Sequence, residues 1–588
     1  KKKRLKTWRV LKTTVRKRVK GAKRAFVNNR LNAQQNTKEW WDTLRSVTQP
    51  NKNKVTNSTL IIDGTAMNPS AFCNNINKYY TDVGGDLLED CNNDACTNET
   101  PVTPLDHLSV SEIKHHLKRL NTTKATSTED FPTWVSYEGL EDICIPLQSI
   151  INSMLTSSEF PDKWKRSQIK PSQKISMPSQ YKDFRPISLL FHLGKLAEDI
   201  IINKMRNTLS NIIDPSQFAY QNKIGTVDAL LQLLDDYTSE LDKPSVKFMQ
   251  LAGIHFSKAF DRLQPPILID KMRNYGFNEN ITKLVANFLQ NRQQSVKYND
   301  QCSSYVDCKV GAPQGTKLGP VLWLIYCNDL TAQGFSHVKY ADDTSFYTPI
   351  KNHTNQSAVI HALQAASDWS AENSMLLNTS KTVVLNTCLS SRFLYDDCIT
   401  FDDTVLNPST NIKFLGVHLD TNLSFNTHAD KIISKCNSRI FLMKKLKTIG
   451  LNAEGLKMFY ISNIRSVMSY AALCWYTFLS DTNKQRLETI QKTAVKVILP
   501  EFSYEESLIA LNLPTINDFL FNLADGHFSK VLSNPSHPLH DRIIFNNVRT
   551  SSRSSNTFRP KLCRTEKRRH SFFNYFMEYR NNKFLYRQ

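Results

Sequence analysis

The chain has 588 residues, of which 40% are hydrophobic, and a formal net charge of +21. This length suggests about three or four domains, or one large body with appendages. No apolar run reaches about 18 residues and no signal-peptide pattern opens the chain, so neither a membrane-spanning helix nor a secretory leader is expected. Because the chain begins with Lys rather than Met, a fragment of something longer is one interpretation.

The positive charge is concentrated at the two ends. Residues 1–24 hold 13 Lys or Arg and no acid, and residues 549–569 hold eight against a single Glu, which leaves a net charge of about +1 for everything else. Cationic ends on a nearly neutral body suit a polyanion partner. A solvated tail or a nuclear-localisation signal would have the same composition.

The twelve Cys are scattered, without a C-x-x-C pair or a Cys/His cluster at zinc spacing. The closest pairs, Cys91 with Cys96 and Cys302 with Cys308, lack His partners. We interpret them as reduced, structural thiols of an intracellular protein.

The first third of the chain is predicted to be mainly helical. Residues 1–48 form a basic helical arm that ends in Trp40-Trp41, a pair suited to anchor the arm to the body, and residues 84–103 form a polar linker. Ser109-Val-Ser-Glu112 is a capping-box signature that opens a helix. Periodicity predicts further helices over residues 71–83, 134–158 and 193–209.

The middle of the chain is predicted to alternate strands and helices. A strand from about Val246 leads into IHFSKAFDRL, two helices follow over residues 267–290, and two strands lie within residues 293–310. A Gly/Pro-rich loop over residues 311–320 then feeds an apolar helix over residues 321–330.

Residues 337–347, HVKYADDTSFY, form a β-type run that is interrupted by adjacent Asp342 and Asp343. The pattern predicts a hairpin with both acids at its tip. Two carboxylates held together repel each other unless a cation lies between them. A solvated turn is the alternative for any such pair, and it also applies to the pairs that begin at Asp235, Asp396 and Asp402.

The last third of the chain is predicted to be helical and then basic. After a turn over residues 414–417, helices are expected over residues 428–447, 453–476 and 483–498. The stretch from Tyr504 on ends in a basic segment in which Tyr575, Tyr579 and Tyr586 are interleaved. Such a composition suits phosphate contacts and base stacking.

Four motifs occur along the chain in a fixed order: RPIS from Arg185, FSKAFD over 256–261, PQG over 313–315 and YADD over 340–343. This series resembles the reverse transcriptases of non-LTR retrotransposons. The resemblance continues through FLGV over 414–417 and LExIQ from Leu487, and it covers about residues 105–580.

The resemblance implies an α+β right-hand polymerase that has fingers, a palm with an antiparallel sheet and a helical thumb. The boundaries that it suggests are a basic arm and linker over 1–104, an N-terminal extension and fingers over 105–245, a palm over 246–425 within a reverse transcriptase domain of about 150–420, a thumb over 426–500 and a C-terminal extension over 501–588.

The polymerase reaction uses two Mg²⁺ ions held by convergent carboxylates. The resemblance assigns Asp342 and Asp343 to two of these ligands and expects a third Asp just before Phe256, where this chain has His255. Imidazole is neutral or cationic and cannot bridge two Mg²⁺ ions. Asp261 lies six residues after His255, about 9 Å along a helical path, and is not expected to replace the missing carboxylate.

The resemblance assigns further roles to five residues. Phe260 would pack under the sugar and exclude a 2′-hydroxyl, with an ordinary core aromatic as the alternative, while Gln314 and Gly315 would let backbone approach nucleotide and template. Lys381 would lie near the leaving pyrophosphate, and Arg185 would contact triphosphate or template phosphate. A surface lysine and a structural salt bridge are the respective alternatives for these two.

A second departure from the family lies in the segment 217–226. The family usually has an Arg just before a Ser-Thr or Gly-Thr pair, and Ile224 stands there. Lys223 is expected to substitute with poorer geometry, because Lys lacks the planar fork of Arg. Two lost functional side chains favour a decaying element copy.

The resulting hypothesis is an RNA-directed DNA polymerase of a non-LTR retrotransposon, without the endonuclease, whose synthesis is severely weakened or absent. Its expected partners are an RNA template, a DNA primer or target and dNTPs, in the nucleus or cytoplasm. In the thumb, Lys431, Lys435, Lys444, Lys445 and Lys447 would follow a duplex backbone, or form a solvated face. The alternatives are a catalytically dead nucleic-acid-binding relic of the same fold and a related enzyme such as a maturase or telomerase.

Overall fold

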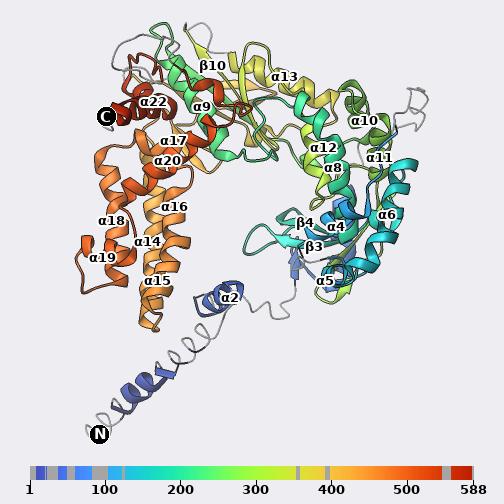
Figure 1. Cartoon of the computed structure of the whole chain (residues 1–588), viewed down its shortest axis with the longest axis horizontal. Coiled ribbons are helices and arrows are strands. Elements are labelled where there is room, and N and C mark those ends of the chain that lie inside the picture. Colours follow the sequence, from blue (N-terminus) through green and yellow to red (C-terminus); the bar gives the residue numbers. More distant parts are fainter. Residues whose placement is uncertain are drawn as a thin grey trace.

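The computed structural model describes residues 37–48, 60–82, 104–121, 126–351, 358–390, 398–545 and 558–585, together with parts of the stretch 8–29. Figure 1 shows a four-stranded central sheet with a second sheet and its helices on one side and a group of C-terminal helices on the other. No helix in the described ranges is both long and apolar enough to span a bilayer.

The central sheet has the order β11-β5-β10-β9 and is antiparallel throughout. Its strands are β5 (Phe248–Ile254), β9 (Ser336–Tyr340), β10 (Asp343–Ile350) and β11 (Val383–Thr387). Every residue of β5 is buried, as expected for a central strand that is covered on both faces. The predicted strand from about Val246 and the predicted hairpin are therefore both present.

Alternate residues of the central sheet face two different cores. Leu251 pairs with Tyr347 and Leu385, and this row packs with α9 (Thr226–Leu241) and the C-terminal helices. The neighbouring row begins at Ala252 and packs with α12 (Leu318–Tyr326) and α13 (Ala358–Glu372). The sheet thus separates the two cores, and packing on both faces fixes the β9–β10 turn and the end of β5 at one edge of the sheet.

The second sheet has the order β4-β3-β6-β7, with β8 also paired to β6. Its strands are β3 (Arg166–Gln173), β4 (Phe184–Leu190), β6 (Arg292–Tyr298), β7 (Gln301–Cys302) and β8 (Val306–Cys308). β3 pairs with β6 in parallel, and the other pairs are antiparallel.

Helices surround the second sheet, and the capping box that was predicted at Ser109 opens α4. The helices on this side are α3 (Pro69–Thr81), α4 (Val110–Lys118), α5 (Thr133–Glu138), α6 (Leu140–Ser157), α7 (Asp162–Lys165), α8 (His192–Ile212), α10 (Pro265–Asn274) and α11 (Glu279–Leu289). A short hairpin, β1 (Leu60–Ile62) and β2 (Thr65–Met67), precedes them.

The C-terminal helices begin after two further hairpins, β12 (Ile399–Phe401) with β13 (Thr404–Leu406) and β14 (Asn411–Phe414) with β15 (Val417–Asp420). They are α14 (Asn426–Thr448), α15 (Ala453–Phe459), α16 (Ser466–Ser469), α17 (Ala472–Trp475), α18 (Asp481–Ile498), α19 (Tyr504–Leu511) and α20 (Ile516–Leu532). The single helix predicted over 453–476 is wrong, because a π-helical turn, Tyr460–Arg465, follows α15 and Ala471 adopts a left-handed φ of +49° before α17.

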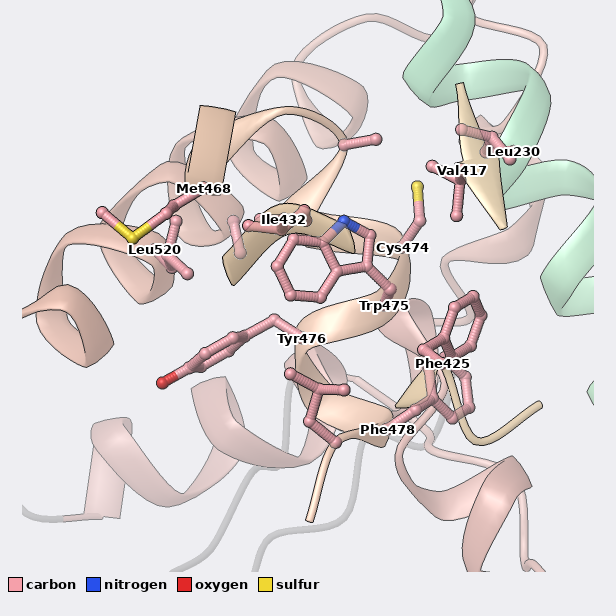
Figure 2. Packing of buried hydrophobic residues seen from close by; sticks show 14 of the residues in the cluster. Leu230, Val417, Phe425, Ile432, Met468, Cys474, Trp475, Tyr476, Phe478 and Leu520 are labelled. Atoms are coloured by element: carbon pink, nitrogen blue, oxygen red, sulfur yellow. The ribbon is translucent and has the colours of Figure 1, made fainter. Parts of the chain in front are cut away.

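Trp475 lies where the C-terminal helices meet α9 and the β14–β15 hairpin. Its side chain is fully buried, and Figure 2 shows it among side chains that include Leu230 of α9, Val417 of β15 and Ile432 of α14. Its indole Nε1 donates to the carbonyl of Tyr470 at 3.1 Å. One continuous core therefore joins the C-terminal helices to the sheet.

The last helices, α21 (Glu566–Arg569) and α22 (Phe572–Leu585), fold back onto α9. Arg542 Nη1 lies 2.7 Å from Asp235 Oδ2 and 2.6 Å from Asp236 Oδ1, and Arg568 Nη1 lies 2.5 Å from Asp235 Oδ1. The prediction of a solvated turn at Asp235 is wrong, because both acids lie within α9 and are paired with these guanidinium groups. The pair at Asp402, by contrast, forms the predicted turn between β12 and β13.

The interleaved tyrosines of the tail belong to the core. Tyr575 and Tyr579 are half-buried against Phe521, and the ring centroids of Tyr579 and Phe521 are 4.5 Å apart. Base stacking by these two rings is therefore not supported. Tyr586, the linker over 84–103, Cys91, Cys96 and the pair at Asp396 lie outside the described residues, and every described cysteine is free.

The N-terminal arm is described in part. Residues 10–19 are helical and exposed, and α2 (Thr37–Thr48) follows. Leu44 is buried, and Trp40 and Trp41 pack against the core that contains the C-terminal helices. The predicted aromatic anchor is confirmed.

Candidate active site

The β9–β10 hairpin carries the two aspartates at its tip. Tyr340 pairs with Asp343, so Ala341 and Asp342 form a two-residue turn in which Ala341 has a φ of +58°. Trp323 of α12 fixes this turn, because its indole Nε1 donates to the carbonyl of Ala341 at 2.8 Å. The predicted location of both acids is confirmed.

The strand register brings His255 directly opposite Asp343. Thr344 pairs with Ile254, the last residue of β5, so the next residue along β5 faces the preceding residue of β10. Nδ1 of His255 lies 2.8 Å from Oδ1 of Asp343, and the two side chains are 39% and 41% exposed. This hydrogen bond is the main cause that raises the pKa of His255 above its usual value. His255 therefore occupies the place where the resemblance expects a carboxylate.

Asp342 lies in the same electrostatic group. Burial is the main cause that raises its pKa above the usual range for Asp, and the neighbouring charge of Asp343 raises it further. His255 and Lys381 act in the opposite direction, because cations favour the ionised carboxylate. The structure thus brings four of the expected residues together: Asp342, Asp343, His255 and Lys381.

The loop after α13 holds Lys381 beside this group. Asn378 N donates to the carbonyl of His255 at 2.8 Å, and Lys381 N donates to the carbonyl of Asn378 at 3.1 Å. The exposed Lys381 side chain then lowers the pKa of His255 by like-charge repulsion.

The residues present do not fit a site for two divalent cations. His255 supplies no bridging oxygen and engages one oxygen of Asp343. Across the described residues no group of three or more His, Cys, Asp or Glu side chains is arranged to hold a metal ion. Asp261 does not fill the gap, because its carboxylate accepts from Gln314 Nε2 at 3.1 and 3.3 Å.

Phe260 lies in the loop after β5 and is half-buried. Its ring centroid is 5.5 Å from that of Trp323, the same residue that fixes the aspartate turn. Its carbonyl accepts from Ala312 N at 2.9 Å, which ties the loop to the Gly/Pro-rich segment. The ring therefore has a packing role, and its proximity to Trp323 places it near the hairpin.

Gly315 makes a close approach to the chain itself. It has a φ of +121°, and a Cβ at this position would lie 2.8 Å from the carbonyl oxygen of Ser188 in β4. The neighbouring carbonyl of Gln314 accepts from Ser188 N at 2.8 Å. This glycine was predicted to admit a nucleotide, whereas its close contact in the structure is with β4.

A cationic group extends from the aspartates toward β4. Arg185 is exposed and forms no ion pair within the described residues, so the salt-bridge alternative finds no support. Burial lowers the pKa of Lys174, and the charges of Arg185, Lys258 and Lys381 lower it further. Lys174 and Lys258 were not among the predicted site residues, although Lys258 lies within the FSKAFD motif.

The segment before α9 approaches the aspartates through Tyr220. Burial and the charge of Asp342 raise the pKa of Tyr220, which has a φ of +58° and is 49% exposed. Lys223 is exposed, and its carbonyl accepts a hydrogen bond from Lys530 of α20. The contacts found for Lys223 are therefore with α20, and no contact within the described residues joins it to the aspartates.

The C-terminal helices engage several of the lysines that were expected to follow a duplex. Lys431 Nζ lies 3.2 Å from His418 Nδ1, Lys447 Nζ donates to the carbonyl of Val497 at 2.5 Å, and Lys445 Nζ lies 4.5 Å from the Phe441 ring centroid. The turn over 414–417 is held by the hydroxyl of Tyr470, which donates to the carbonyl of Leu415 at 2.6 Å.

Residues 170–419 match the family model described as reverse transcriptase (RNA-dependent DNA polymerase). This part of the chain is a reverse transcriptase domain. It contains the central sheet, the aspartate hairpin, His255 and Lys381. The expected α+β fold, with a palm sheet between fingers and a helical thumb, is confirmed (Figure 1).

Curated relatives carry polymerase names from mobile elements. The chain is 24% identical over 435 residues to the probable RNA-directed DNA polymerase from transposon BS of Drosophila melanogaster, covering 68% of this chain and 46% of that protein. It is 23% identical over 451 residues to the RNA-directed DNA polymerase from mobile element jockey of the same organism, covering 74% and 49%. The resemblance to retrotransposon reverse transcriptases is confirmed, and the chain spans about half the length of these relatives.

Among solved structures, telomerase from Candida albicans in complex with a fragment of telomeric RNA is 14% identical in sequence, with a TM-score of 0.35. The similarity covers 68% of this chain and 75% of that one.

Proposed function

We propose that the chain is the polymerase portion of a retrotransposon protein of the non-LTR type and that its DNA synthesis is severely weakened or absent. RNA would be the template, DNA the primer or target, and dNTPs the substrates. The observation that carries the proposal is the 2.8 Å contact between His255 and Asp343, because it puts an imidazole where the reaction needs a carboxylate.

The remaining residues keep the roles that the family gives them. Asp342 and Asp343 are two of the three expected Mg²⁺ ligands, and Asp343 is partly engaged by the imidazole. Arg185 and Lys381 would face phosphates of the incoming nucleotide, because both are exposed and cationic near the hairpin or β4. Phe260 would bound the sugar. Lys223 contributes less than the missing Arg would, since Lys lacks the planar fork of Arg.

The proposed domains keep the boundaries that the resemblance suggests. Residues 105–245 would contain the N-terminal extension and fingers, 246–425 the palm, 426–500 the thumb and 501–588 a C-terminal extension, with the basic arm before them. The extension is fastened to α9 of the reverse transcriptase domain by Arg542 and Arg568. Because α9 packs against Leu251, Tyr347 and Leu385 of the central sheet, the extension would move with the palm. We place the protein in the nucleus or cytoplasm, where its template would be found.

A second candidate is a nucleic-acid-binding protein that keeps the fold without synthesis, and the imidazole at residue 255 favours it as well. Primer extension on an RNA template with Mg²⁺ and dNTPs separates the two. The unmodified chain and His255→Asn should both fail to extend, whereas His255→Asp should synthesise DNA. Retained template binding with no synthesis by His255→Asp would leave the binding protein as the answer.

A further inference from the structure

A cavity of about 480 Å³ opens where α14, α18 and α19 meet. In Figure 1, α18 and α19 lie on the side of α14, α15 and α16 that faces away from β3 and β4. Its lining includes Lys444, Lys492, Lys496, Phe502, Tyr504 and Ser507, and we call it the thumb cavity. Its volume falls within the range of roughly 300–1,000 Å³ that is usual for ligand sites.

Three lysines converge on the thumb cavity without a carboxylate partner. Lys444, Lys492 and Lys496 are exposed and form no ion pair within the described residues. Lys492 Nζ lies 5.2 Å from the Tyr504 ring centroid, and Lys496 Nζ donates to the carbonyl of Phe502 at 3.5 Å. Like charges around one space repel each other unless an anion lies between them.

Two nearby carboxylates are already engaged by other groups. Glu506 accepts from Ser503 N at 2.8 Å in the capping box of α19. Glu488 accepts from the hydroxyl of Tyr504 and from Ile516 N, the latter at 3.0 Å. Neither forms an ion pair with the three lysines in the described residues, and neither does Glu505, whose charge acts on Tyr504. The three ammonium groups are therefore left for a ligand.

The cavity also offers an aromatic ring and a spare hydroxyl. Phe502 is 45% exposed, although a phenyl ring gains by being covered. Ser507 is 1% exposed, and its hydroxyl has no hydrogen-bond partner among the described residues. An exposed ring beside several cations is the combination that binds single strands, because bases stack on the ring while phosphates meet the cations.

We propose that the thumb cavity binds a nucleotide of single-stranded nucleic acid, with its phosphates at Lys444, Lys492 and Lys496 and its base on Phe502. The proposal goes beyond the polymerase function, because the strand would lie on the outer side of the thumb helices, away from the aspartate hairpin. An unpaired part of the element RNA has the right chemistry. A free nucleotide shares that chemistry, and the test separates the two sources.

The test measures binding of a fluorescent single-stranded RNA of mixed sequence to the full chain, without dNTPs. Saturating unlabelled primer–template duplex is present, so that the site near the aspartates is filled. Replacing all three lysines by Ala should weaken binding by about tenfold or more. It should also flatten the dependence of log K on log salt by about two, because each lost phosphate contact on a single strand removes about 0.7.

The matched control replaces Lys118, Lys247 and Lys283 by Ala. These lysines are exposed, form no ion pair in the described parts of the chain and lie on α4, before β5 and on α11, so the net charge changes equally. Control binding should remain within about twofold of the unmodified chain. Phe502→Ala should weaken binding by roughly five- to a hundredfold through lost stacking. Circular dichroism melts should coincide for all variants, because every replaced side chain is exposed.

Two competitors complete the test. Displacement of the labelled strand by millimolar ATP would assign the site to free nucleotides, and retention would assign it to a strand. Equal losses in the lysine variant and its control would overturn the proposal. The proposal would also be overturned if decaglutamate displaced the labelled strand as effectively as unlabelled RNA and Phe502→Ala bound the strand unchanged. The site would then recognise acidic peptide. DNA synthesis by His255→Asp with an unaltered cavity would concern only the polymerase function.

Discussion

Replacing Trp475 by Ala should weaken the packing of the C-terminal helices against the reverse transcriptase domain. The side chain is fully buried, and a buried aromatic residue removes about 150–250 Å² from water, or roughly 4–6 kcal/mol at about 25 cal/mol per Å². The hydrogen bond from its Nε1 to the Tyr470 carbonyl adds about 1 kcal/mol. Because burial counted from an extended chain is an upper bound, the expected loss in the free energy of unfolding is about 3–5 kcal/mol, the usual range for truncating a buried Trp to Ala.

Urea unfolding followed by circular dichroism at a helix wavelength measures this loss. Trp134→Ala is the matched control, because Trp134 is 56% exposed, and it should change the free energy of unfolding by less than about 0.5 kcal/mol. Trp475→Phe keeps a ring but loses the indole donor, so it should fall between the two. If Trp475→Ala were as mild as the control, the core in Figure 2 would not be the joint between the two parts.

Three further predictions concern stability. Gly315→Ala should lower the free energy of unfolding by about 2–4 kcal/mol, because φ is +121° and a Cβ would lie 2.8 Å from Ser188 O. Gly526→Ala in α20, with open space around it, should instead raise it by up to about 1 kcal/mol. Thermal melts of the two variants test both predictions. Arg542→Ala should lower the free energy of unfolding by about 3–5 kcal/mol, because it leaves Asp235 and Asp236 without this partner, and Arg542→Lys should lower it less. An unchanged urea unfolding curve for Arg542→Ala would contradict this. Burial raises the pKa of Asp228, but the imidazoles of His527 and His537, 3.0 and 3.4 Å away, more than offset this, so its pKa is lowered in the fold. The stabilisation by ionised Asp228 is therefore complete above the unfolded pKa of about 4 and is lost as pH falls below that value. Asp228→Asn should therefore lose less stability than the unmodified chain between about pH 4 and pH 2. Acid titrations in which the two chains lose stability equally would contradict this.

The elements that were predicted correctly depend mainly on residues that are close together in the sequence. The capping box at Ser109 needs only residues up to Glu112, and the hairpin at Asp342 needs only alternation on either side of a short turn. The break at Ala471 was not predictable, because no Gly or Pro marks it in the sequence, and its left-handed φ occurs at a residue buried in the same core as Trp475.

Long-range partners account for the errors. The pair Asp235 and Asp236 was interpreted as a turn because Arg542 and Arg568 lie more than 300 residues away in sequence. Tyr579 was grouped with a basic tail, and its partner Phe521 lies on another helix. In both cases the residue types were noted correctly, but the tertiary contact that decides their role could not be predicted from the sequence.

In the candidate site, too, some features were predicted from the sequence and others required the structure. The position of His255 followed from the motif order, and the strand register confirms that it faces Asp343. That its Nδ1 engages the carboxylate, and that Tyr220 rather than Lys223 approaches Asp342, required the three-dimensional arrangement. Tyr220 has one visible signal, its place in the segment between Phe218 and Gly225 that resembles the family.

The most direct measurement is single-turnover incorporation of one dNTP by the unmodified chain, His255→Asn and His255→Asp on the same RNA template. A carboxylate about 4 Å from a cation gains roughly 4 kcal/mol at an effective dielectric constant near 20, which corresponds to about 10³ in rate. We predict that the incorporation rate of His255→Asp exceeds that of both other chains by at least about a hundredfold. Equal, robust incorporation by the unmodified chain and His255→Asp would contradict it.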